Sequence, residues 1–117
     1  MNEVWGQLLS VDLNGCEHSF MNSPEKLKEF SKRICKEIEM IPFGEPIVKK
    51  LGKGRLEGWS MMQFIETSTI TVHLDEFDDR TFIDIFSCKR FDVEKTKKFC
   101  KDFFNAKKIR AKNLYRY

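Results

Sequence analysis

The chain has 117 residues and a formal net charge of +3, from 21 Lys and Arg against 18 Asp and Glu. This length fits a single domain, 1–117, and leaves no room for a separate dinucleotide-binding domain. The small positive excess argues against a general nucleic-acid binder. Phenylalanine is abundant, at 11 residues, and so many rings must enter a core, an interface or an aromatic-lined site.

The start of the chain has no basic segment followed by an apolar run, and no stretch reaches the roughly 18 apolar residues of a membrane helix. We therefore expect a cytoplasmic protein without membrane contact. With only two histidines and no C-x-x-C pair, we expect no metal site. In a reducing cytosol the cysteines are free thiols, most of which pack as small hydrophobic side chains: Cys16, Cys35, Cys88 and Cys100.

Hydrophobic periodicity predicts a strand over residues 4–13 and then a helix that begins at Ser23-Pro24. Serine is a favourable N-cap, and proline is well accepted at the first helical position. Proline and glycine between residues 42 and 46 end this helix. Its apolar residues recur at three- and four-residue steps and form one stripe: Leu27, Phe30, Ile34 and Ile38.

Strands dominate the second half of the chain. Alternating and β-branched runs predict strands at 47–51, 57–65, 69–74 and 81–88. Asp92 can cap a second helix over 93–104, whose stripe contains Val93, Thr96, Cys100 and Phe103. A basic strand over 107–116 ends the chain, and its charges suit an exposed sheet edge.

The resulting order, β-α-β-β-β-β-α-β, predicts an α+β two-layer domain. In this fold class an antiparallel sheet carries both helices on one face. The strand over 81–88 is apolar on both faces, with Phe82 and Phe86 on one and Ile83 and Ile85 on the other. Because such a strand is normally covered on both faces, we expect the sheets of two subunits to pair in a dimer.

Two residues with catalytic potential stand near the ends of neighbouring strands, His73 and Cys88. In a simple hairpin they lie at opposite ends, so their proximity requires a bend or a long turn. A lone histidine is usually structural, and a cysteine on an apolar strand usually belongs to the core. The residues alone therefore leave both a catalytic and a structural interpretation open.

Five segments extend this pattern at a recognisable spacing. Residues 66–73 resemble a Ser-Glu-Ser-His-x-x-x-His stretch, and 84–88 resemble Asp-x-Phe-Thr-Cys. The number of residues between these two segments also agrees, so the alignment needs no gap there. Residues 58–60 match Gly-x-Ser, 9–16 match a first strand with its following Gly-Cys, and 106–109 match Ala-Lys-Arg-Val. Together they cover nearly the whole chain, which resembles the prokaryotic S-adenosylmethionine decarboxylase proenzymes.

The resemblance implies a self-processing, pyruvoyl-dependent decarboxylase of polyamine (spermidine) biosynthesis. The Ser68 hydroxyl would attack the carbonyl of Thr67 and turn the peptide into an ester. Elimination would then cut the chain into a β chain, 1–67, and an α chain, 68–117. The remnant of Ser68 would become a pyruvoyl group, which forms a Schiff base with the substrate amine and takes up electrons as CO2 leaves.

The resemblance also implies roles for three further side chains. His73 assists the elimination, Cys88 reprotonates the product carbon, and Ser60 supports processing. Family members of this length form homodimers of processed protomers, with the site near the subunit interface. The implied partner is a small amino-acid substrate, and neither nucleic acid nor a membrane.

The chain departs from the family pattern beside the cleaved serine. Thr67 stands where glutamate is usual, and Thr69 stands where histidine is usual. A β-branched residue is stiffer, so we expect slower processing. This departure motivates a second hypothesis, in which the chain is an uncleaved relative that acts as a binding or regulatory partner.

The substrate pocket departs as well. Asp75 stands where the family has a tryptophan that holds adenine, and Phe77 or Trp59 are the rings that could replace it. Glu76 lies one place from the family glutamate that holds the ribose. The acidic run within residues 75–79 can be interpreted as a solvated turn, as a metal-binding loop, or as part of a pocket for a more cationic substrate. The last reading suggests ornithine or arginine as an alternative substrate.

Overall fold

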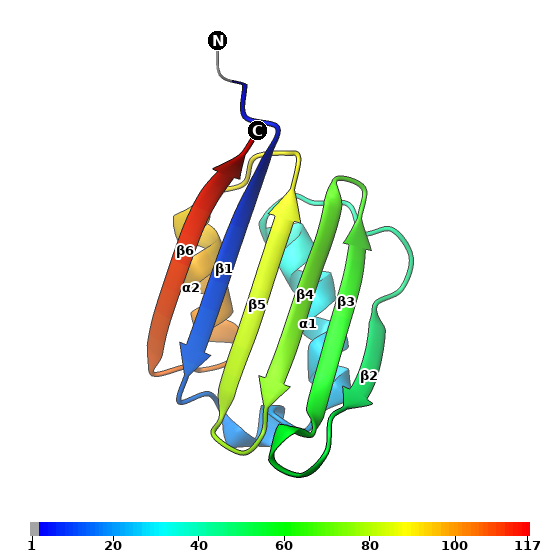
Figure 1. Cartoon of the computed structure of the whole chain (residues 1–117), viewed down its shortest axis with the longest axis vertical. Helices are drawn as coiled ribbons and strands as arrows, with labels where there is room; N and C mark the ends of the chain where they lie inside the picture. The colour runs from blue at the N-terminus through cyan, green and yellow to red at the C-terminus, as the bar shows by residue number, and fades with distance from the viewer. Residues whose placement is uncertain (1–2) are drawn as a thin grey trace.

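The computed structural model describes residues 3–117 and has the element order expected from the sequence (Figure 1). The strand over 47–51 has the expected bounds, and the other strand bounds differ from the expected ones by at most two residues. Two short 3-10 turns are added, η1 (His18–Phe20) and η2 (Gly54–Leu56). The helices and strands are α1 (Pro24–Glu37), α2 (Val93–Phe103), β1 (Gly6–Asn14), β2 (Ile47–Leu51), β3 (Gly58–Ile65), β4 (Ser68–Asp75), β5 (Arg80–Ser87) and β6 (Lys108–Arg116).

The strands form one antiparallel sheet in the order β2-β3-β4-β5-β1-β6. Figure 1 shows both helices on the same side of this sheet, so the predicted α+β two-layer class is confirmed. The first strand lies inside the sheet between β5 and β6, and the basic β6 is an edge strand, as expected. In the described residues, no helix is both long and apolar enough to cross a membrane.

Both helices begin at the predicted caps. The Ser23 hydroxyl accepts a hydrogen bond from the Lys26 N–H at 3.1 Å, and the Asp92 carboxylate accepts one from the Lys95 N–H at 3.0 Å. Each cap satisfies a backbone donor that the helix itself leaves unpaired, which stabilises a helix by about 1 kcal/mol. The cap positions therefore determine where each apolar stripe starts.

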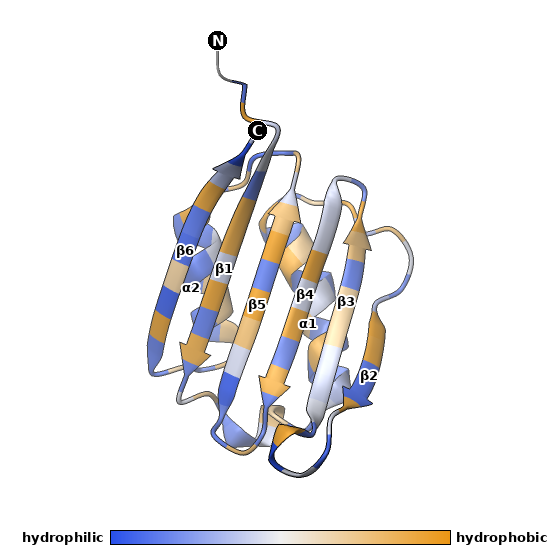
Figure 2. Cartoon of the chain, viewed as in Figure 1, coloured by the Kyte–Doolittle hydropathy of each residue, from blue (hydrophilic) through white to orange (hydrophobic). Residues whose placement is uncertain are grey.

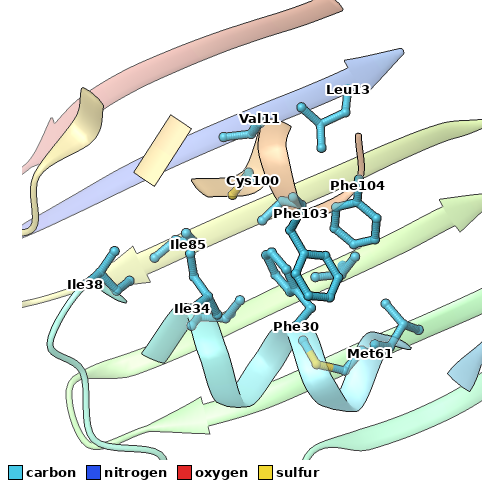
Figure 3. Packing of buried hydrophobic residues seen from close by; sticks show 14 of the residues in the cluster. Val11, Leu13, Phe30, Ile34, Ile38, Met61, Ile85, Cys100, Phe103 and Phe104 are labelled. Atoms are coloured by element: carbon cyan, nitrogen blue, oxygen red, sulfur yellow. The ribbon is translucent and has the colours of Figure 1, made fainter. Parts of the chain in front are cut away.

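The core lies between the helices and the covered face of the sheet (Figure 3). Phe30 of α1 packs edge-on against Phe103 of α2, with ring centroids 5.2 Å apart, and its centroid lies 5.1 Å from that of Phe104. Burying each large apolar side chain contributes roughly 1.5–3 kcal/mol. The predicted stripe residues of α1 are all buried: Leu27, Phe30, Ile34 and Ile38.

The other face of the sheet carries no helix, and we call it the open face. In β5, Ile83 and Ile85 are fully buried on the covered face, whereas Phe82 and Phe86 are half-buried on the open face. Figure 2 shows this alternation of hydropathy along the strands. The predicted division of β5 is confirmed, and the second subunit over the open face stays a prediction. The apolar open-face residues include Leu8, Ile47, Leu51, Met62, Phe64, Phe82, Phe86 and Leu114.

Candidate active site

The predicted site residues fall into two groups at opposite ends of the sheet. Ser68 is the first residue of β4 and pairs with Ser87, whereas His73 of the same strand pairs with Phe82. At roughly 3.3 Å per residue, the five positions from Ser68 to His73 span about 17 Å. We call the end with Thr67, Ser68 and Cys88 the cleavage end, and the end with Ser60, His73 and Asp75 the histidine end.

The turn at the cleavage end places its backbone strain on Ser68. Glu66 and Thr67 form a two-residue turn between β3 and β4, and Ile65 pairs with Ser68. Such turns usually need a positive φ at one or both turn residues. Here Glu66 and Thr67 lack it, and Ser68 instead has a φ of +152°. Since a residue with a side chain rarely adopts this conformation, it costs on the order of 1–3 kcal/mol.

The peptide bond before Ser68 is also polarised. The backbone N–H of Cys88 donates a hydrogen bond to the carbonyl oxygen of Thr67 at 2.9 Å. A donor at this position stabilises the negative charge that forms on the oxygen when a nucleophile attacks the carbonyl carbon. On the other side of the turn, the N–H of Glu66 donates to the carbonyl of Ile41 at 2.9 Å. The cleavage end thus fits the formation of a pyruvoyl group from Ser68.

All four cysteines are free thiols, and Cys88 is the one that is exposed. Burial raises the pKa of the Cys35 thiol to about 11 and that of the Cys100 thiol to about 12. Cys16 is buried as well, and burial raises its pKa. Cys88 is exposed beside the Thr67 carbonyl, so its thiol can exchange a proton with a molecule bound at the cleavage end.

Two predicted residues meet at the histidine end. Ser60 of β3 pairs with His73 of β4, and the Ser60 Oγ lies 2.8 Å from the His73 Nδ1. Because this contact orients the exposed imidazole through Nδ1, the Nε2 atom is the one available for proton transfer. The structure therefore brings Ser60 and His73 together, and separates both from Ser68 and Cys88.

Asp75 lines a cavity of about 220 Å³ beside His73, but both oxygens of its carboxylate are engaged. The Asp75 Oδ2 lies 2.6 Å from the guanidinium of Arg80, and Oδ1 accepts the N–H groups of Phe77 and Asp78 at 3.2 and 3.3 Å. The charge of Asp75 is thus balanced within the turn. The residues that line this cavity include Arg55, His73, Asp75, Arg80 and Phe82.

The two candidate stacking rings lie in different places. Phe77 is 61% exposed in the turn beside the cavity, and the Arg55 guanidinium lies 3.9 Å from its ring centroid. Trp59 follows the alternation of the covered face, and its Nε1 donates to the Asn22 Oδ1 at 2.9 Å. Glu76 is half-buried in the same turn as Phe77. Of the predicted substrate-binding residues, Asp75, Glu76 and Phe77 therefore lie at the histidine end, whereas Trp59 follows the covered face.

Sequence reasoning missed a chain of hydrogen bonds at the cleavage end. The Ser87 hydroxyl donates to the Thr67 Oγ1 at 2.8 Å, and Thr67 donates to the Met40 Sδ at 3.4 Å. Ser87 lies within the 84–88 segment that resembles Asp-x-Phe-Thr-Cys, at its threonine position, but that resemblance gave it no role, and its burial has the alternation of an ordinary strand residue. Within residues 3–117, no cluster of three His, Cys, Asp or Glu side chains is arranged to hold a metal ion.

Comparisons with known proteins agree over almost the full chain. The family model described as S-adenosylmethionine decarboxylase matches residues 7–117. The S-adenosylmethionine decarboxylase proenzyme of Clostridium botulinum strain Hall is 29% identical over 112 residues, which cover 95% of this chain and 93% of that protein. The strain Loch Maree protein of the same name is 30% identical with the same coverage.

A solved structure supports the same fold. The adenosylmethionine decarboxylase of Aquifex aeolicus VF5 superposes with a TM-score of 0.82 at 15% sequence identity. The superposition covers 98% of this chain and 92% of that chain. The shared architecture is thus retained at low sequence identity.

Proposed function

The chain belongs to the S-adenosylmethionine decarboxylase family, whose members are pyruvoyl-dependent carboxy-lyases, and we propose that it makes its catalytic group by cutting itself between Thr67 and Ser68. One observation carries the proposal: the strained Ser68 follows a carbonyl that already accepts a hydrogen bond from Cys88. The products are a β chain, 1–67, and an α chain, 68–117, that begins with the pyruvoyl group.

Cleavage proceeds by rearrangement within the backbone. The Ser68 Oγ bonds to the carbonyl carbon of Thr67, the C–N bond breaks, and the hydroxyl proton passes to the nitrogen. Loss of the Ser68 α-proton then breaks the Cβ–O bond and leaves a carboxylate on Thr67. The resulting enamine becomes an imine, and water converts it to the ketone with release of ammonia. The Cys88 N–H stabilises the oxyanion of the first step.

A pyruvoyl group at residue 68 would supply a carbonyl that can bind the amine of S-adenosylmethionine and accept the electron pair that CO2 leaves behind. The exposed Cys88 thiol then delivers a proton to the carbon that has lost its carboxylate. This role suits Cys88 because its backbone already contacts the residue before the new ketone. The product serves polyamine synthesis.

We infer that the complete site needs two copies of the chain. The chain has two histidines, and neither is at the cleavage end. His73 lies about 17 Å along β4 from Ser68, and His18 contacts Asp79 in the turn after β4. If two open faces pair about a two-fold axis that runs across the strands, the histidine end of one copy lies over the cleavage end of the other. The apolar side chains of the open face support such a homodimer.

S-adenosylmethionine is favoured over ornithine and arginine as the substrate. Family membership supports it, and the free carboxylate that motivated a basic substrate is paired with Arg80. We propose that Phe77 and Glu76, which share the turn beside His73, contact the nucleoside, and that Trp59 has a structural role through Asn22.

Intact-mass measurement of the purified chain tests the proposed cleavage. We expect two fragments separated at Thr67 and Ser68, with an α chain that has a ketone in place of its amino group. The Ser68→Ala variant should stay at full length. A wild-type chain that remains intact after prolonged incubation would refute cleavage and support the uncleaved regulatory partner.

Two further measurements test substrate and assembly. CO2 release should occur with S-adenosylmethionine and be absent with ornithine and arginine, and the reverse result would reject the proposed substrate. Light scattering after size-exclusion chromatography should give the mass of two copies. A cleaved and active monomer would contradict the two-copy site.

A further inference from the structure

We propose that Ser87 is a positioning residue for chain cleavage: its hydroxyl holds Thr67, and thereby the peptide that Ser68 attacks. The inference rests on the proposed cleavage at Thr67. It assigns a role to a fully buried hydroxyl that touches neither the substrate nor the reacting atoms. Ser87 ends β5, directly opposite Ser68.

Ser87 and Thr67 link the backbone of Lys89 to the sulfur of Met40 through hydrogen bonds. The backbone N–H of Lys89 donates to the Ser87 Oγ at 2.9 Å, Ser87 donates to the Thr67 Oγ1 at 2.8 Å, and Thr67 donates to the Met40 Sδ at 3.4 Å. A backbone N–H can only donate, and each hydroxyl has one proton to give. The Ser87 Oγ also lies 3.7 Å from the Met40 Sδ. The contacts with Ser87 and Met40 together hold the Thr67 hydroxyl in place.

Thr67 is thus held twice by neighbouring residues. Ser87 binds its side chain, and the Cys88 N–H binds its carbonyl oxygen. The hydroxyl of Ser68 has to reach the Thr67 carbonyl carbon within the same strained turn, so a small rotation of this peptide misdirects the attack. Without the Ser87 hydroxyl, Thr67 can rotate, and the bond from Cys88 to the carbonyl loosens with it.

The series of hydrogen bonds ends at Met40, which lies in another segment of the protein. Met40 is 5% exposed in the loop after α1, and the Lys89 Nζ donates to the carbonyl of Glu39 in that loop at 2.8 Å. The N–H of Glu66 bonds to Ile41 next to it. The loop after α1 and the end of β5 therefore hold the turn from two sides, and Ser87 joins them through Thr67.

The rate of cleavage in Ser87→Ala tests this role. Full-length chain is purified under denaturing conditions, refolded, and followed by intact mass. We expect fragments to appear about tenfold more slowly than in wild type, the effect of losing one buried hydrogen bond in the transition state. Ser87→Thr keeps the hydroxyl and should restore most of the rate.

A matched control separates positioning from general stability. The buried Ser31 hydroxyl of α1 donates to the Gln63 Oε1 at 2.9 Å, away from the cut. Ser31→Ala removes a comparable hydrogen bond and should cleave at the wild-type rate. Hydroxylamine, which cuts esters, should release less fragment from Ser87→Ala than from wild type at early times, because ester formation is the step that slows.

The Thr67→Val variant tests the same hydrogen bond from its other partner. It keeps the branched shape and removes the hydroxyl, so it should cleave as slowly as Ser87→Ala, and the double variant should be no slower than either. Wild-type rates in either single variant would overturn the role of Ser87, and a Ser87→Ala chain that fails to refold leaves Thr67→Val to decide. A wild-type chain that stays intact would instead refute the proposed function itself.

Discussion

The two ends of the sheet carry complementary halves of one chemistry. The cleavage end has a strained serine, a polarised carbonyl and an exposed thiol, and it has no imidazole. The histidine end has an imidazole oriented by Ser60 and a charged cavity, and it has no such peptide. Strand β4 keeps the two groups about 17 Å apart, and for this reason we propose that the complete site draws on two copies of the chain.

Mixing two inactive variants gives the largest expected effect. Ser68→Ala retains His73 and has nothing to cut, whereas His73→Ala retains Ser68 and lacks the imidazole. Each alone should stay intact. When both are co-expressed in equal amounts, about half of the His73→Ala chains pair with the other variant and should be cleaved, as read by intact mass. No cleavage in the mixture would show that His73 acts within its own chain.

Removing the thiol separates the two roles of Cys88. In Cys88→Ala the backbone N–H remains, so the chain should still be cleaved to completion. Turnover of S-adenosylmethionine should fall by about 100-fold or more because the proton donor is lost, as measured by CO2 release. The buried Cys35→Ala serves as the control and should keep its turnover. A turnover in Cys88→Ala equal to that of the wild-type chain would exclude the Cys88 thiol as the proton donor.

Loss of the contact at the histidine end should have a moderate effect. Ser60→Ala frees the Nδ1 of His73, and we expect cleavage about tenfold slower since the imidazole is no longer oriented. The rate of fragment appearance measures this. Ser10→Ala, on the open face of β1, is the control that should leave the rate unchanged.

Strain at Ser68 predicts a small reversal in stability. Glycine within a strand is normally less stable than alanine by roughly 0.5–1 kcal/mol. At residue 68 a φ of +152° favours glycine, so Ser68→Gly should be more stable than Ser68→Ala by about 1 kcal/mol. Urea unfolding of these two uncleaved chains measures the difference. If Ser68→Ala is instead more stable than Ser68→Gly, the turn is unstrained at residue 68.

The smallest effect concerns pH at the histidine end. The hydrogen bond that the His18 Nδ1 donates to the Asp79 carboxylate, together with the charge of that carboxylate, raises the pKa of His18 above 6.5. A raised pKa in the folded chain stabilises it below the unfolded pKa, and the stabilisation is lost as pH rises through the folded pKa. His18→Gln should therefore lower the unfolding free energy more at about pH 5.5 than at about pH 9. An equal loss at both pH values would contradict this.

Much of the fold could be predicted from local patterns. The caps at Ser23 and Asp92 and the stripe that contains Phe30 were all confirmed, because caps and periodicity act over a few residues. For His73 and Cys88 the sequence left proximity open on condition of a bend or a long turn, and the register instead places the two residues at opposite ends of the sheet.

The sequence by itself determined the order of elements, the two faces of β5 and the motifs around Ser68, since each depends on residues that are neighbours in the chain. Only the tertiary structure decided that Cys88 donates to Thr67, that Ser87 holds the same residue, and that Arg80 balances Asp75. These contacts depend on strand register and turn conformation. Both are set by packing of the whole sheet against its helices, and a one-residue shift would undo them.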